Sequence, residues 1–158
     1  MGGDLARRQP PDWRRRIAIL PPTPDPSLAG RGVSSTPSSR ALTRARGAVG
    51  VPFRLHGRDL RGMDCVGLVA WAWEVAAPTG YALRASPAAR IARDLAALGF
   101  VRGEGAGAIV LAAPGPGQLH LGISTGDGLI HADAIARRVV ERTAPLPWPV
   151  LATWIRED

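Results

Sequence analysis

The chain has one cysteine and three histidines, and the positions of three of these four residues suggest nucleophilic chemistry. Cys65 stands at the predicted start of a helix, where unpaired backbone N–H groups and the positive end of the helix dipole favour a thiolate. His120 and His131 follow on two predicted strands of one hairpin. A thiol and two imidazoles that can converge are the side chains that a cysteine hydrolase uses to attack a carbonyl carbon.

The alternation of side chains along a strand places the two histidines relative to each other. The segment 125–128, Thr-Gly-Asp-Gly, has the sequence of a hairpin turn. A two-residue loop at this turn pairs Gly122 with His131. His120 and His131 then share one face of the hairpin, a single diagonal step apart. In this arrangement His120 accepts the proton of Cys65, and His131 orients His120 through its other ring nitrogen.

Other interpretations of these residues remain open. A lone cysteine is often a buried small hydrophobic residue. A zinc site of Cys65, His120 and His131 is conceivable, although structural zinc requires four protein ligands and no fourth ligand is obvious in the sequence. His56 lies in a predicted loop and is expected to be a loop residue rather than part of the site. Gly67 is expected to keep the first helical turn slim, which would leave room for a substrate beside the sulfur.

The helices and strands that position these side chains can be predicted from capping residues and from the apolar pattern of the sequence. Three helices are predicted in the first part of the chain, at 40–49, 65–76 and 87–98, with Ser39, Asp64 and Ser86 as their N-caps. Five short segments rich in Val, Ile and Leu follow and predict strands at 108–112, 119–125, 129–132, 138–142 and 150–155. Segments 53–63, 114–117 and 145–147 are predicted loops or turns. Helices followed by a meander of strands indicate an α+β fold with an antiparallel sheet.

The composition changes sharply near residue 38. Residues 1–38 are rich in Pro, Ser and Arg and predict a disordered arm, whereas 39–158 is expected to form the folded domain. The formal charge of +7 belongs to the N-terminal part, because residues 1–46 hold nine arginines against three carboxylates, while 47–158 hold eleven against ten. The nearly neutral domain gives no sign of nucleic-acid binding.

The sequence also bears on membranes and compartment. No apolar run is long enough to span a bilayer, and the N-terminal segment lacks the apolar core of a secretory signal. A single cysteine excludes an internal disulfide, so nothing requires an oxidising compartment. Neither a nucleic acid nor a membrane is therefore expected as a partner.

Two blocks of the sequence resemble the NlpC-type cell-wall cysteine peptidases, a papain-like family. The first block is Gly50-Val51-Pro52-Phe53-Arg54, then Gly57-Arg58, then Asp64-Cys65-Val66-Gly67-Leu68. The second block is His120-Leu121-Gly122-Ile123 followed by Gly128-Leu129-Ile130-His131-Ala132. The resemblance covers essentially the whole predicted domain and is greatest for the branch found in phage tails and gene transfer agents.

The resemblance implies an α+β, papain-like fold in which the nucleophile helix packs on a short antiparallel sheet that carries the histidines. It implies an endopeptidase that hydrolyses peptidoglycan stem peptides through a thioester, typically at the bond between D-glutamate and a diamino acid. Carried over by position, Cys65 is the nucleophile, His120 the general base and His131 the orienting third member. No metal or organic cofactor is implied. The implied partners are the stem peptide and, for this branch, phage-like tail proteins. The protein would stay in the cytoplasm until lysis or act at the wall from a tail-like particle.

The sequence departs from the family pattern at three positions. Phe53 stands where many members have a tyrosine, Ala108 where many have an aspartate, and Val66 where serine is common. Without a hydroxyl at Phe53, stabilisation of the oxyanion would fall on the backbone N–H of Cys65. Phe53 and Ala108 favour an alternative, a weakly active or inactive structural component of a phage-like tail. Amidase or acyltransferase chemistry on the same fold, and binding of nucleic acid or membrane by the basic arm, also remain open.

Overall fold

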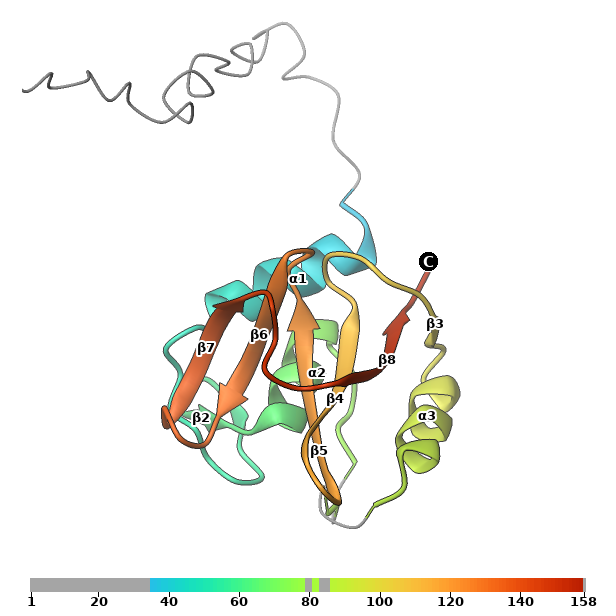
Figure 1. Ribbon diagram of the computed structural model, residues 1–158. Coiled ribbons are helices and arrows are strands. Elements are labelled where there is room, and N and C mark those ends of the chain that lie inside the picture. The colour runs from blue at the N-terminus through green and yellow to red at the C-terminus, as the bar shows by residue number, and fades with distance from the viewer. Residues whose placement is uncertain (1–34, 79–80, 83–85, 158) are drawn as a thin grey trace, which may run out of the picture. The chain divides into compact units, whose positions relative to one another are not determined.

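The computed structural model describes residues 35–78, 81–82 and 86–157. The arm predicted for residues 1–38 lies almost entirely outside this range. From Ser35 onward the chain forms one compact unit (Figure 1). Its elements in chain order are α1 (Pro37–Gly47), β1 (Arg58–Asp59), β2 (Gly62–Met63), α2 (Cys65–Trp73), α3 (Ala88–Ala97), β3 (Val101–Arg102), β4 (Ile109–Gly115), β5 (Gln118–Ser124), β6 (Gly128–Asp133), β7 (Arg138–Thr143) and β8 (Val150–Ile155).

The strands predicted from the second half of the sequence form one antiparallel sheet. Six strands pair in the order β3-β8-β4-β5-β6-β7, which confirms the predicted α+β class. In Figure 1, α2 lies behind the sheet and α1 crosses its upper end, while α3 stands at the side of β8 and β3. Because α2 packs against both β5 and β6, the cysteine helix and the two histidine strands share one interface.

Two of the three predicted N-caps are wrong. The Thr36 hydroxyl oxygen accepts a hydrogen bond from Ser39 N at 3.1 Å, so α1 begins earlier than expected and Ser39 lies inside it. The Ser86 hydroxyl donates to the carbonyl oxygen of Ala82 instead of capping α3. Asp64 is the predicted cap that the structure retains, because its carboxylate reaches the N–H group three residues ahead.

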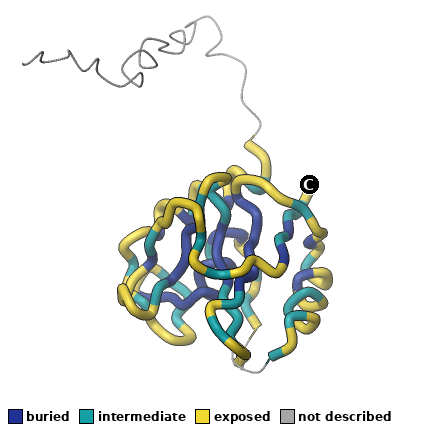
Figure 2. The backbone as a smooth tube through the Cα atoms, viewed as in Figure 1, coloured by how far each residue is buried: buried dark blue, intermediate teal, exposed yellow. Residues whose placement is uncertain are grey.

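The cysteine helix α2 is shorter and more buried than its sequence pattern indicates. It ends at Trp73, since Glu74 adopts a left-handed conformation with φ 52° and its carboxylate pairs with Arg44 of α1 at 2.5 Å. Seven of its nine residues are buried, so the helix has no solvent-facing stripe (Figure 2). The helix packs against α1 on one side and against the sheet on the other, which accounts for this burial.

The hydrophobic core lies between α2 and the central strands. Its largest fully buried apolar side chains include Leu68 of α2, Ile109 and Leu111 of β4, Ile123 of β5 and Ile130 of β6. Burying side chains of this size contributes roughly 1.5–3 kcal/mol each. The same core therefore holds the cysteine helix and the histidine hairpin in fixed positions.

The segment predicted as a loop before Cys65 is ordered by backbone hydrogen bonds. It contains the short pair β1–β2, and Met63 N donates to Pro52 O at 3.0 Å while Arg54 N donates to Met63 O at 3.1 Å. Phe53 N donates to Arg137 O at 2.9 Å, which ties the segment to the start of β7. Two-residue strands are too short to carry an alternating apolar pattern, so they could not be predicted from the sequence. The predicted turn at 114–117 is also partly wrong, because β4 continues to Gly115.

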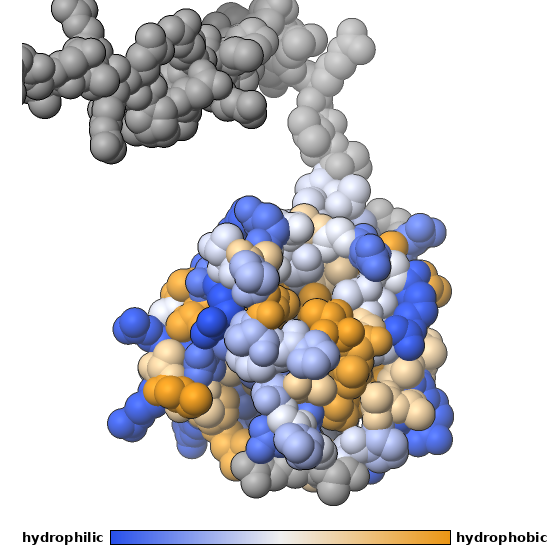
Figure 3. Space-filling model, viewed as in Figure 1, coloured by the Kyte–Doolittle hydropathy of each residue, from blue (hydrophilic) through white to orange (hydrophobic). Residues whose placement is uncertain are grey.

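Several aliphatic side chains are exposed on the described surface. Figure 3 shows apolar side chains over β4 and β8 on the viewed face. Val101 of β3 and Val150 and Leu151 of β8 are exposed by 54%, 48% and 47%. Single exposed aliphatic residues are common in folded domains. Among the described residues no helix is long and apolar enough to cross a bilayer.

Candidate active site

The nucleophile end of the site is organised around the buried carboxylate of Asp64. Its Oδ1 accepts a hydrogen bond from Gly67 N at 2.8 Å, and its Oδ2 accepts one from His56 N at 2.8 Å and one from the Tyr81 hydroxyl at 2.5 Å. The three bonds fix the first turn of α2, the loop before it and the segment after it. Cys65 is the next residue, so its position is set by the same carboxylate.

Tyr81 is the residue that sequence reasoning missed at this end of the site. It is the single tyrosine of the chain, and it lies outside any helix or strand, with no motif around it. Burial and its hydrogen bond to Asp64 raise the pKa of the Tyr81 phenol, so the hydroxyl remains a donor. The guanidinium of Arg58 lies 5.6 Å from the centre of the Tyr81 ring and donates to Pro78 O at 2.7 Å. Only the folded chain brings these residues to Asp64.

Gly67 has a different reason to be a glycine from the one expected. A Cβ atom at Gly67 would lie 2.0 Å from the carbonyl oxygen of Gly57, far inside van der Waals contact. The same carbonyl oxygen accepts a hydrogen bond from Asp64 N at 3.4 Å. The space beside the first turn of α2 is thus filled by the loop backbone, and the expectation of room for a substrate there is wrong.

The thiol of Cys65 is enclosed in the resting structure, with only 3% of the residue exposed. Burial raises the pKa of Cys65 to about 12, although hydrogen bonding from the backbone of Leu121 acts in the opposite direction. The helix N-terminus was expected to lower this pKa, and desolvation outweighs it. Cys65 is therefore a neutral thiol that lies against β5, next to the position of His120.

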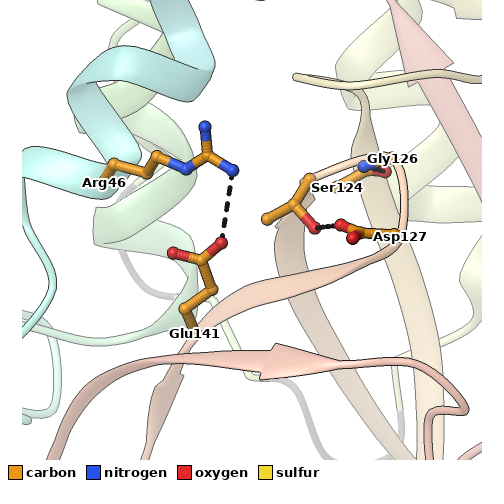
Figure 4. A network of polar contacts seen from close by, with 6 residues as sticks. Arg46, Ser124, Gly126, Asp127 and Glu141 are labelled. Carbon is orange, nitrogen blue, oxygen red and sulfur yellow. Dashed lines mark hydrogen bonds and ion pairs between the residues drawn. The ribbon is translucent and has the colours of Figure 1, made fainter. Parts of the chain in front are cut away.

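The histidine end of the site is built by the hairpin of β5 and β6. The pairs Ile123–Ile130 and Ser124–Leu129, together with the bond from Thr125 N to Gly128 O at 3.0 Å, confirm the predicted two-residue turn. Figure 4 shows this turn, where Asp127 accepts from the Thr125 hydroxyl at 2.9 Å. The figure also shows the Arg46–Glu141 ion pair, at 3.3 Å, between α1 and β7.

The hairpin register brings the two imidazoles together as predicted. His120 Nε2 and His131 Nδ1 are 2.9 Å apart, a hydrogen-bond distance, and the rings meet edge to face at 87°. Trp148 packs on both, with ring centres 5.4 Å from His120 and 5.1 Å from His131. The position of Trp148 could not be predicted from the sequence, because this residue lies in a Pro-rich segment without a strand pattern.

The hydrogen bond between the histidines occupies one of the two ring nitrogens of His120. Because His131 occupies Nε2 of His120, Nδ1 of His120 is the nitrogen available to a thiol. If Nδ1 is to accept a proton, Nε2 must carry one and donate it to His131 Nδ1. His131 then carries its own proton on Nε2, which is buried and has no partner among the described residues. The productive tautomer therefore leaves one buried N–H unsatisfied.

Both imidazoles are neutral in the resting site. Burial, and then the neighbouring His131, lower the pKa of His120 to about 4. Burial also lowers the pKa of His131, while Asp133 acts in the opposite direction. A neutral imidazole can accept a proton, so His120 can serve as a base at neutral pH. No hydrogen bond joins the Cys65 thiol to His120 in the described structure, and the resting site is a neutral pair rather than an ion pair.

The remaining candidates fall outside this arrangement. His56 is an exposed loop residue with φ 62°, as expected, and contributes its backbone N–H to Asp64. Phe53 is half-buried and bridges to Met63 through its backbone. Within the described part of the chain, no group of three or more His, Cys, Asp or Glu side chains is placed to bind a metal ion.

Comparison with solved structures identifies the fold. The chain superposes on NlpC1 from Trichomonas vaginalis with a TM-score of 0.59 and 20% identity, over 80% of this chain and 47% of that one. It superposes on the peptidoglycan hydrolase RipB from Mycobacterium tuberculosis with a TM-score of 0.51 and 20% identity, over 76% and 64%. The P60 domain of an antigen from M. avium subspecies paratuberculosis gives a TM-score of 0.51 and 19% identity, over 76% and 93%.

These matches show the papain-like α+β fold of NlpC/P60 structures, as the resemblance implied. The chain spans about half the length of the Trichomonas protein. The sequence itself matches no protein-family model and no curated protein. At identities near 20% the likeness concerns the fold, so chemistry must be argued from the site.

Proposed function

We propose that this protein is a cysteine endopeptidase that hydrolyses peptidoglycan stem peptides at the bond between D-glutamate and a diamino acid. The observation that carries the proposal is the 2.9 Å contact between His120 Nε2 and His131 Nδ1, beside a cysteine at the start of α2. A neutral base with an orienting partner, next to a thiol, is the arrangement that acyl transfer needs. The likeness of the fold to RipB, named a peptidoglycan hydrolase, supports the substrate class.

The proposed reaction has two acyl-transfer steps. Cys65 Sγ attacks the γ-carbonyl carbon of D-glutamate while His120 Nδ1 takes the thiol proton, and the backbone N–H of Cys65 stabilises the developing oxyanion. His120 then gives the proton to the amine of the diamino acid, the C–N bond breaks, and a thioester remains. A water molecule attacks the thioester, His120 takes its proton, and the sulfur leaves with that proton as a free thiol.

The enclosed neutral thiol makes this a general-base mechanism. With a pKa of about 12 for Cys65 and about 4 for His120, a preformed thiolate–imidazolium pair is strongly disfavoured in the resting site. Proton transfer must therefore accompany attack on the carbonyl, after substrate has entered. The burial of Cys65 thus predicts slow reaction with small alkylating agents in the absence of substrate.

The test uses purified full-length protein and its Cys65→Ala variant on peptidoglycan of the diaminopimelate type, with released fragments identified by mass spectrometry. Fragments ending in D-glutamate that appear only with Cys65 present would establish the activity and the bond. A Val49→Ala variant, changed at an exposed site on the loop after α1, is the matched control and should digest like the parent.

A second candidate is a weakly active or inactive structural component of a phage-like tail. Two observations favour it: Cys65 is almost fully enclosed, and Phe53 has no hydroxyl to offer the site. The sequence resemblance to the tail and gene-transfer-agent branch points to the same setting, with tail proteins as partners. Failure of the folded parent protein to release any fragment would favour this candidate over the peptidase.

A further inference from the structure

Asp133, the last residue of β6, lies on the same face of the sheet as the two imidazoles. It stands two residues after His131, and side chains two residues apart on a strand point to the same side. The pairing of β6 with β7 runs without a shift from Gly128 to Asp133, so no bulge turns the carboxylate to the other face. The proposed peptidase reaction does not use this carboxylate.

The Asp133 carboxylate is fixed by the turn that follows it. Its Oδ1 accepts hydrogen bonds from Ile135 N at 2.8 Å and from Ala136 N at 3.1 Å. Burial alone would raise the pKa of Asp133, but these two N–H groups act in the opposite direction and the pKa is lowered, so the carboxylate is charged at neutral pH. Arg138 stands opposite Asp133 on β7, yet within the described structure no ion pair joins the two. The negative charge is therefore held in place without a paired cation in that part of the chain.

The histidine pair must carry a positive charge during the proposed reaction. Once His120 Nδ1 has taken the proton of Cys65, the charge lies on His120. It lies on His131 instead if the Nε2 proton of His120 crosses the 2.9 Å bond to His131 Nδ1. His131 is 1% exposed, and its Nε2 has no partner among the described residues. Burying a charge without an opposite charge or a hydrogen bond is costly, and a fixed anion on the same face would reduce that cost.

Two charges of opposite sign act on the imidazoles from neighbouring positions of the sheet. Burial lowers the pKa of both rings, and Asp133 opposes that effect at each of them, whereas Arg142 adds to it at His131. Arg142 pairs with Leu129 in the β6–β7 ladder and so lies on the same face. Its guanidinium lies 5.6 Å from the centre of the Trp148 ring, which packs on both imidazoles. Asp133 and Arg142 therefore oppose each other at this site.

The other ionisable groups near the rings do not supply the negative charge. Cys65 of α2 is a neutral thiol at rest. The carboxylate of Asp64 acts electrostatically on Cys65 but on neither imidazole. Glu141 of β7 alternates to the opposite face, where it pairs with Arg46 of α1 at 3.3 Å (Figure 4). Within the described part of the chain, Asp133 is thus the carboxylate that the sheet presents on the face of the imidazoles.

We propose that Asp133 is a positioning residue of the proposed peptidase site, where it stabilises the positive charge that the two imidazoles carry once the Cys65 proton has been taken up. The kinetic consequence rests on the proposed function, whereas the effect on the imidazoles does not require catalysis. Asp133 acts through the two rings rather than on the reacting atoms. Removing its charge should make His120 a weaker base and slow the proton transfers that accompany acyl transfer.

The first test is a titration of the histidine rings by NMR in the full-length Cys65→Ala protein. Asp133→Asn removes the charge but keeps Oδ1 as an acceptor for the turn, so the fold should persist. In this variant each ring should become one-tenth charged at a pH lower by roughly 0.3 to 0.7, the scale of a partly exposed charge pair. Arg142→Gln should change the titration of His131 in the opposite direction. Comparing the pH of one-tenth charging keeps the titration above the pKa of His120, about 4.

Asp127→Asn is the matched control for this titration. Asp127 lies in the turn at the other end of β6, and the same exchange there keeps an acceptor for the Thr125 hydroxyl. The control should leave both ring titrations unchanged. An equal change in Asp127→Asn would mean that only the net charge of the domain acts on the rings, and would overturn the assignment. An unchanged titration in Asp133→Asn would overturn it too, whether or not the protein cleaves peptides.

The second test measures the pH profile of kcat/KM for the full-length protein on L-Ala-γ-D-Glu-meso-diaminopimelate. Asp133→Asn should reduce kcat/KM roughly 2- to 5-fold at neutral pH and move the acid limb of the profile to lower pH, while Asp127→Asn should match the parent. A loss of rate with an unmoved acid limb would indicate a disturbed turn and overturn the assignment, as would full activity despite an altered ring titration. An altered titration without cleavage by the parent would overturn the peptidase and support the charge effect of Asp133 on the imidazoles.

Discussion

Asp64, beside Cys65, accepts hydrogen bonds from three separate segments, whereas His131, beside His120, has a buried ring nitrogen without a partner among the described residues. The Cys65 side of the site is fixed by polar contacts that converge on one carboxylate. The histidine side is fixed by strand register, by the apolar packing of Trp148 and by a single bond between the rings. The contacts of Asp64 are compatible with one arrangement of the first turn of α2. The contacts of the histidines are compatible with two tautomers of the His120–His131 pair.

The contrast indicates where the protein resists change and where its chemistry is adjustable. Loss of a contact to Asp64 strands a buried donor or acceptor and should lower stability. Replacing His131 removes a side chain whose Nε2 already lacks a hydrogen-bond partner among the described residues. The replacement should therefore lower activity more than stability. The three predictions below follow from that contrast.

Replacing His131 should have the largest effect on catalysis. In His131→Ala, His120 loses the acceptor for its Nε2 proton, and kcat/KM should fall roughly 100- to 10,000-fold. In His131→Asn, the side-chain oxygen can accept from Nε2 and leaves no ring N–H unsatisfied, so most of this loss should be recovered. Steady-state kinetics on the tripeptide L-Ala-γ-D-Glu-diaminopimelate measure kcat/KM for both variants. Equal activity of the two variants would contradict an orienting role for His131.

Replacing Asp64 should have the largest effect on stability. Asp64→Ala removes the cap of α2 and leaves the N–H groups of Gly67 and His56 without their acceptor, which should lower the free energy of unfolding by about 2–4 kcal/mol. Tyr81→Phe removes only one of the three bonds and should cost about 1 kcal/mol. Urea denaturation measures both changes. A Tyr81→Phe loss as large as that of Asp64→Ala would mean that the phenol, not the carboxylate, organises this end of the site.

The smallest effect expected is a loss of stability in mild acid. The folded protein holds the pKa of His120 at about 4, below its ordinary value of about 6.5, and holds that of His131 below its ordinary value too. As pH falls from about 6.5 to 4 the unfolded chain takes up protons that the folded chain does not, so stability decreases across that window. The urea midpoint should drop between pH 7 and pH 5, and less so in His131→Asn. A midpoint that stays constant in the parent would contradict the buried neutral imidazoles.

Features of the site that depend on local sequence patterns could be predicted from the sequence, whereas features that depend on contacts between distant residues could not. The hairpin was predictable because side chains alternate strictly along strands and a Gly-Asp turn fixes the register, which is why His120 and His131 were placed on one face correctly. The Asp64 cap was predictable because its side chain bonds within three residues. Local rules were sufficient for both features.

Features that depend on distant contacts were missed or misjudged. Tyr81 reaches Asp64 across 17 residues through a segment without a periodic pattern. The pKa of Cys65 depends on burial beneath the sheet, which overrides the helix N-terminus that local reasoning emphasised. Gly67 was expected to leave room for a substrate. In the structure the carbonyl oxygen of Gly57 lies beside it, and the loop that holds Gly57 has no periodic pattern from which this contact could be predicted.

The backbone link between the nucleophile segment and β7 bears on when the site can form. Gly50 N donates to Val139 O at 2.9 Å, Val139 N donates to Val51 O at 2.8 Å, and Phe53 N donates to Arg137 O at 2.9 Å. These bonds join parts of the chain that are synthesised far apart in time, and such non-local pairing forms late in folding. A chain still emerging from the ribosome thus carries Cys65 without the strand that positions its loop, so the proposed peptidase site would form only when synthesis is nearly complete. Chains stopped before Arg137 should accordingly react with iodoacetamide at Cys65 much faster than the finished protein.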